Sequence, residues 1–213
     1  MVYTRGMQRI LVLSIFVAAF SVKAEVPPRL QKFEIKKPTP QWFGERLDLP
    51  PKGFAPDLGL TGVEEILFAP GMFKATEKDF FSYVFLFALE PKPELTAEVL
   101  RKQLLVYYTG LSKARLGQSK LDVSKFSVKL LPLKLQEQSP EGALQSKFYR
   151  AEVKWIEPFA TKKFQTLHFE LQTWKYAKSK YNYLFVCASP QTRDKPIWKT
   201  LREIRASVKL KKK

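Results

Sequence analysis

The chain has 213 residues, of which 45% are hydrophobic and 27% charged, and its formal net charge is +17. This is the composition of a globular protein, and it excludes an intrinsically disordered chain. A single histidine and a single cysteine exclude an internal disulfide and any metal site with several Cys and His ligands. The chain has no Gly-rich phosphate loop or nucleophile elbow, so the sequence predicts no cofactor.

Residues 1–24 have the pattern of a secretory signal peptide. Arg5 and Arg9 precede an apolar run at 10–20, and the small residue Ala24 precedes a cleavage site before Glu25. The run is shorter than the roughly 20 apolar residues of a transmembrane helix, so no retained transmembrane helix is predicted. We therefore expect an exported protein, periplasmic or extracellular.

The mature chain is strongly basic. Loss of the three basic residues of the signal peptide lowers the charge from +17 to +14. A charge of this size favours an anionic partner, such as anionic lipid or acidic polysaccharide, although it is also typical of a lysine-rich soluble surface. The lysines near the C-terminus are not part of a recognised nucleic-acid module, so no sequence-specific nucleic-acid binding is predicted.

Residues 25–60 form a proline-rich segment. Proline removes a backbone donor and fixes φ, so neither a long helix nor a central strand is expected here. Trp42, Phe43 and Phe54 supply apolar anchors. These anchors predict that the segment wraps onto a single domain at 61–213.

The first half of this domain is predicted to hold two strands and a helix. A short strand is expected at 63–68. In the uncharged stretch 80–89, both the even-numbered and the odd-numbered residues are mostly apolar, which predicts a strand covered on both faces. A helix at 97–114 follows, with Thr96 as its N-cap and an apolar face. That face contains Leu100, Leu104, Tyr107 and Leu111.

The second half is predicted to hold four strands and a closing helix. The strands are expected at 126–131, 146–156, 163–174 and 181–188, and Pro132 places the first at an edge. Asp194 is the expected N-cap of the closing helix, with Pro196 in its first turn. Its apolar stripe contains Ile197, Leu201, Ile204 and Val208.

This order predicts an α+β fold, in which a mostly antiparallel sheet of about six strands packs against two helices. The element order and the closing-helix residues Trp198, Leu201, Ile204 and Ser207 resemble the Mog1/PsbP-like group over residues 60–210. Val208 departs from that pattern, where the family has an aromatic residue. The resemblance implies a layered sandwich and a binding or assembly role more than catalysis. It assigns no site residue.

The alternation of the last three strands predicts which residues face each other. We expect Leu171 opposite Leu184, and Glu152, His168 and Cys187 in one row, with slips of two residues left open. A carboxylate, an imidazole and a thiol in this order are typical of an activated cysteine nucleophile, so one hypothesis is a hydrolase or transferase. The alternative is a buried structural cysteine.

The same sheet face carries Phe164, Trp174, Tyr181, Tyr183 and Phe185. With Arg150 and Lys154, these residues could form a groove for a sugar, a lipid headgroup or a peptide, or carry a small apolar ligand. The alternative is that the closing helix covers them. The function that we expect from the sequence is that of an exported, non-catalytic envelope protein that binds an anionic or a protein partner.

Overall fold

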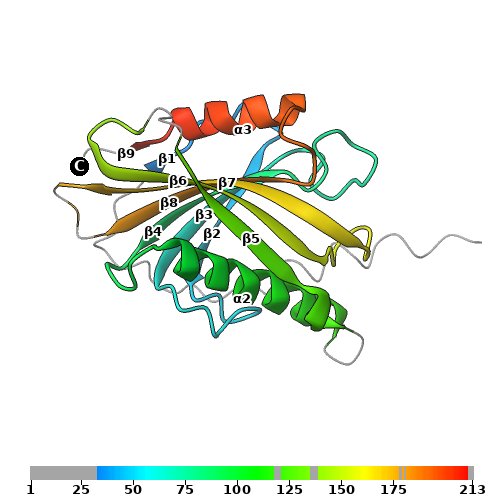
Figure 1. The fold of residues 1–213 in the computed structure, drawn as a ribbon. Helices are drawn as coiled ribbons and strands as arrows, with labels where there is room; N and C mark the ends of the chain where they lie inside the picture. The colour runs from blue at the N-terminus through cyan, green and yellow to red at the C-terminus, as the bar shows by residue number, and fades with distance from the viewer. Residues whose placement is uncertain (1–32, 118–120, 135–138, 178, 180, 211–213) are drawn as a thin grey trace, which may run out of the picture.

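The computed structural model describes residues 33–117, 121–134, 139–177, 179 and 181–210 (Figure 1). The predicted signal peptide lies outside these residues. The described chain forms two helices, one short 3-10 helix and nine strands. They are β1 (Phe33–Glu34), β2 (Phe43–Leu49), β3 (Gly62–Phe68), β4 (Tyr83–Leu89), α2 (Ala97–Leu116), η2 (Val123–Lys125), β5 (Ser127–Leu133), β6 (Ala143–Ile156), β7 (Phe164–Tyr176), β8 (Asn182–Ser189), α3 (Pro196–Ala206) and β9 (Lys209–Leu210).

Seven strands form one antiparallel sheet in the order β2-β3-β4-β8-β7-β6-β5. Helix α2 packs on one face of this sheet and α3 on the other (Figure 1). The predicted α+β architecture is therefore confirmed. Strands β1 and β9 form a separate two-stranded sheet that joins the start and the end of the described chain.

The predicted number of about six strands was too low by one. The six predicted strands correspond to β3 through β8, and the missing strand is β2, within the proline-rich segment. Strand β2 lies at an edge of the sheet, between Pro40 and Pro50. An edge strand keeps one side unpaired, so flanking prolines interrupt no ladder.

Strand β4 is buried along its whole length and lies between two hydrophobic cores. Phe85 and Phe87 face the core under α2, while Val84 and Leu86 face the core under α3. The prediction of a strand covered on both faces is confirmed. Each core fills the space between the sheet and one helix, which accounts for the three layers.

The N-terminal cap of α2 is as predicted, whereas that of α3 is not. The Thr96 side chain accepts a hydrogen bond from the backbone N–H of Val99 at 3.2 Å. In α3 the N-cap is Lys195, without a side-chain bond, and Pro196 is the first helical residue. Asp194 therefore precedes the cap by one residue, because Pro196 itself sets where the helix begins.

The described part of the proline-rich segment packs on both faces of the sheet. Phe33 meets Tyr183 edge to face at 5.3 Å, and Trp42 is buried in the core under α3. On the other side Phe54 contacts Tyr107 at 5.0 Å. Gly110 allows this approach, since a Cβ atom there would lie 2.1 Å from the carbonyl oxygen of Phe54.

Candidate functional site

The strand register decides which of the predicted site residues meet. Between β6 and β7 the prediction is confirmed, with Glu152 opposite His168. Between β7 and β8 it was wrong by two residues, because His168 lies opposite Ser189 and Leu171 opposite Val186. A slip of two leaves every side chain on the same face, so alternation alone does not exclude it.

A hydrogen-bonded turn sets the register of the β7–β8 hairpin. The Ser179 N–H donates to the carbonyl of Tyr176, and the Ser179 hydroxyl accepts from the N–H of Tyr181. The same hydroxyl lies 2.6 Å from the hydroxyl of Tyr183. These short-range contacts are not visible in the pattern of apolar residues.

Cys187 lies apart from the pair formed by Glu152 and His168. It is opposite Glu170, fully buried under α3, with its thiol 3.5 Å from the carbonyl oxygen of Leu201. Burial, reinforced by the Glu170 carboxylate, raises the pKa of Cys187 well above its ordinary value. This geometry does not activate a thiolate, and it gives no support to a cysteine nucleophile. Among the described residues, no cluster of three or more His, Cys, Asp or Glu side chains could hold a metal ion.

The aromatic face predicted as a groove is covered. Trp174, Tyr181, Tyr183 and Phe185 are buried in the core under α3, and only Phe164 is exposed. Trp174 and Tyr183 stack with their ring centroids 5.6 Å apart. The covering helix was the alternative interpretation of these residues, and it is the one that the structure bears out. Phe33 of β1 also packs against Tyr183, so these rings are enclosed within the core.

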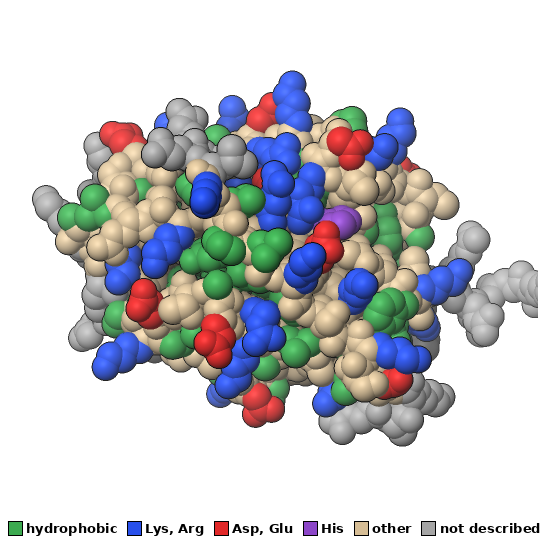
Figure 2. All heavy atoms as spheres, in the orientation of Figure 1, with side chains coloured by type: hydrophobic (Ala, Val, Ile, Leu, Met, Phe, Trp, Pro, Cys, Tyr) green, Lys and Arg blue, Asp and Glu red, His purple; other side chains and the backbone are tan. Residues whose placement is uncertain are grey.

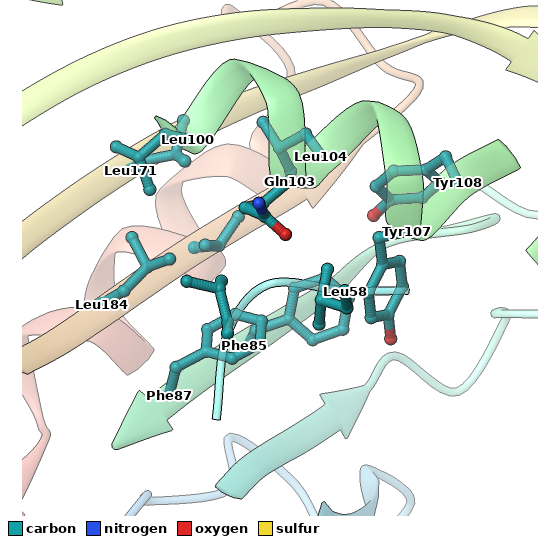
Figure 3. Close-up of a pocket in the computed structure, with 12 residues that line it drawn as sticks. Leu58, Phe85, Phe87, Leu100, Gln103, Leu104, Tyr107, Tyr108, Leu171 and Leu184 are labelled. Atoms are coloured by element: carbon teal, nitrogen blue, oxygen red, sulfur yellow. The ribbon is translucent and has the colours of Figure 1, made fainter. Parts of the chain in front are cut away.

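A small void lies on the other face, between α2 and the sheet (Figure 3). Its volume is about 30 Å³, room for about one water, whereas small-molecule pockets span roughly 300–1,000 Å³. The Gln103 side chain accepts a hydrogen bond from the Gly59 N–H at 2.7 Å and holds the loop with Leu58 and Leu60 against the void. The void is therefore too small to support a carrier function.

Strands β5, β6 and β7 expose part of their α3-side face, because α3 packs on β8 and β4 instead. Figure 2 looks onto this region, where Lys and Arg side chains gather around the single histidine. We call this region the open face, and its residues lie opposite one another on the three neighbouring strands. They are Lys129, Leu131, Arg150, Glu152, Lys154, Thr166 and His168. Lys129, Arg150 and Lys154 are exposed.

Two further arginines border the open face. Arg202 of α3 forms a bidentate pair with the buried Glu170, at 3.0 and 2.7 Å. Arg193, in the loop before α3, donates through Nη2 to the carbonyls of Ala151 and Phe169 at 3.0 and 3.3 Å. Both guanidinium groups lie 5.8 Å from the ring centroid of Trp198, so this buried ring helps to position them.

Positive charge on and around the open face exceeds negative charge. The basic side chains are five, and the acidic side chains are Glu152 and Glu170, which leaves an excess of three positive charges. The five are Lys129, Arg150, Lys154, Arg193 and Arg202. Arg150 forms no ion pair among the described residues. After burial, the charge of Arg150 is the main cause of the lowered pKa of Arg193. A bound oxyanion would relieve this repulsion.

Two nitrogen atoms at the open face have no hydrogen-bond partner within the described part of the chain. The Nε of Arg193 is a buried donor without an acceptor, and the Nδ1 of His168 is also unsatisfied. His168 Nδ1 lies 3.5 Å from Glu152 Oε1. Burial and the charge of Arg193 outweigh Glu152 and lower the pKa of His168, so the imidazole is neutral at pH 7. Unsatisfied buried donors are uncommon in folded proteins.

The structure therefore keeps part of the predicted binding set. Arg150 and Lys154 lie together on the open face, whereas Trp174, Tyr181 and Tyr183 lie beneath α3. Arg193 and Arg202 were not predicted as site residues. They reach the open face from the segment after β8, and no spacing in the sequence indicates that contact.

Comparisons with protein-family models, with curated proteins and with solved structures found no match to this chain. The resemblance to the Mog1/PsbP-like group remains a prediction from element order. No helix within the described residues is long and apolar enough to span a bilayer.

Proposed function

We propose that this is an exported, non-catalytic binding protein that holds an anionic polymer on the open face. The observation that carries the proposal is the convergence of Arg150, Arg193 and Arg202 beside His168 with only two carboxylates to balance them. Arginine binds sulfate, phosphate and carboxylate groups through paired N–H donors. An acidic polysaccharide, which repeats such groups along a chain, fits an extended row of cations.

The open face supports binding better than chemistry. Its residues lie on paired strands of the sheet, and the one thiol of the chain is buried elsewhere. The basic residues also extend along the sheet, from Arg150 to Lys154 on β6 and to Lys129 on β5. Such a row suits a long ligand more than a small substrate.

The test replaces Arg150 with glutamine and measures affinity for heparin, a sulfated polysaccharide. Arg150 is exposed and unpaired, so Arg150→Gln should leave the fold intact. We expect roughly tenfold weaker binding, the loss of about one charge-assisted contact. Arg101→Gln is the matched control, because it removes the same charge from an exposed position on α2, across the sheet. Equal affinities for the two variants would overturn the proposal.

A further inference from the structure

Four phenylalanine rings from distant parts of the chain meet at one end of the molecule. Phe43 begins β2, Phe68 ends β3, Phe73 lies in the following loop, and Phe159 lies in the β6–β7 turn. The ring centroids of Phe43 and Phe68 are 5.0 Å apart, and those of Phe73 and Phe159 are 5.7 Å apart. Figure 1 shows the loop after β3, the β6–β7 turn and the end of α2 at this same end. We call these four residues the aromatic tip.

The aromatic tip exposes apolar surface that the cores do not use. Phe43 is 39% and Phe73 41% exposed, although both rings touch other rings. Phe159 continues inward to the buried Phe81 at 6.0 Å. Single exposed apolar residues are normal, but a contiguous aromatic cluster marks an interaction surface. Phenylalanine has no polar group that would otherwise account for its contact with water.

Positive side chains surround the aromatic tip. Arg115, at the end of α2, lies 5.3 Å from the ring centroid of Phe159. The loop with Phe73 and the turn with Phe159 add four exposed lysines, which are Lys74, Lys78, Lys162 and Lys163.

Most of the acidic groups in these segments are withdrawn from the surface. Glu157 is fully buried and accepts hydrogen bonds from the backbone N–H groups of the β6–β7 turn. Asp79 accepts one from the N–H of Gly71, and Glu45 is half-buried near Arg115. The fourth acid of these segments, Glu77, is exposed. The exposed charge around the tip is therefore clearly positive.

The geometry points to an anionic lipid bilayer as the occupant, with the Phe43 and Phe73 rings inserted among its headgroups. An anionic bilayer attracts the surrounding lysines and accepts the rings without a matching pocket. Lysine stems can lie along apolar surface while the charged ends stay in water. A protein partner fits less well, because the cores of protein interfaces are depleted in lysine.

The test places a fluorescent reporter in the aromatic tip. All four native tryptophans are buried, so Phe73→Trp adds the one exposed indole of the described chain. The variant is mixed with phosphatidylglycerol–phosphatidylcholine vesicles whose acyl chains carry bromine near the headgroups. We expect a blue shift and quenching of the added indole. Vesicle binding without quenching, or no vesicle binding, would overturn the inference.

A second arm measures affinity for the same vesicles without bromine. The double variant Phe43→Ser/Phe73→Ser should bind them at least about tenfold more weakly, since each ring loses part of its burial in the lipid. Leu144→Ser is the control, because Leu144 is 48% exposed and is the second residue of β6, at the end of that strand opposite the β6–β7 turn. An equal loss in both variants would contradict a specific role for the tip.

The inference does not depend on the open face. The phenylalanine variants should keep the heparin affinity of the wild type, and the double variant Phe73→Trp/Arg150→Gln should keep the quenching seen in Phe73→Trp. A loss of quenching in this double variant would show that vesicle binding depends on the open face and would overturn the inference. Failure of either proposal can thus be recognised without the other.

Discussion

Glu64 is an acidic residue buried in the interior of the protein. It lies on β3, fully buried, and its Oε1 accepts a hydrogen bond from the hydroxyl of Tyr107 at 3.0 Å. Its other oxygen has no partner among the described residues. Burial raises the pKa of Glu64 to about 8, so the carboxyl group is protonated in the folded protein at neutral pH.

This pKa predicts how stability changes with pH. The unfolded chain releases the Glu64 proton near pH 4.5, whereas the folded chain keeps it until about pH 8. The free energy of unfolding should therefore fall as pH rises through this range, by on the order of 4 kcal/mol, and level off above it. Glu64→Gln, neutral at every pH, should lack this fall in denaturant titrations.

The control for this titration is Glu141→Gln, which removes an exposed acid and should leave the wild-type pH profile unchanged. If the wild type and Glu64→Gln lost stability equally between pH 5 and 8, Glu64 would not be the buried acid described here.

Helix α3 is held to the sheet by a buried ion cluster as well as by its apolar side. Glu170 of β7 is bound by Arg202 and lies 3.6 Å from Arg205, and both Glu170 and Arg205 are buried. Trp198, Leu201 and Ile204 fill the core beneath the helix. Glu170 is therefore a counter-charge that Arg202 and Arg205 share.

Glu170→Gln tests this cluster with little change in shape. The substitution leaves the Arg205 guanidinium buried without this counter-charge, and breaking such a pair typically costs about 3–5 kcal/mol. We expect chemical denaturation to show a loss of that order. Glu203→Gln, at an exposed position of the same helix, should change stability by less than about 0.5 kcal/mol. A similar small change for Glu170→Gln would show that the cluster adds nothing to stability.

The three layers of the fold can be predicted from the sequence, whereas the residues of the open face cannot. A strand apolar on both sides and two amphipathic helices predict a covered sheet, and β4, α2 and α3 confirm it. Strand β2 was missed because an edge strand beside prolines lacks the apolar pattern of an inner strand. The arginines around the open face meet only through folding, since Arg150 and Arg193 come from segments 43 residues apart.

The register of β7 and β8 decides whether Cys187 can lie beside His168. Residues two apart on a strand share a face, so Cys187 and Ser189 were equally compatible with the position opposite His168. The turn at Ser179 selects Ser189 and leaves Cys187 beneath α3. Local hydrogen bonds in a hairpin thus decide whether three candidate catalytic groups meet.

The salt dependence of heparin binding tests whether the open face holds an anionic polymer. For polyanions, the slope of log affinity against log salt concentration counts the ionic contacts, at about one per contact. Arg150→Gln/Lys154→Gln should reduce the magnitude of the wild-type slope by about two, while Arg101→Gln/Lys102→Gln, with the same charge loss on α2, should leave it unchanged. Equal slopes for the two double variants would rule out the open face as the binding site, because binding would then follow net charge alone.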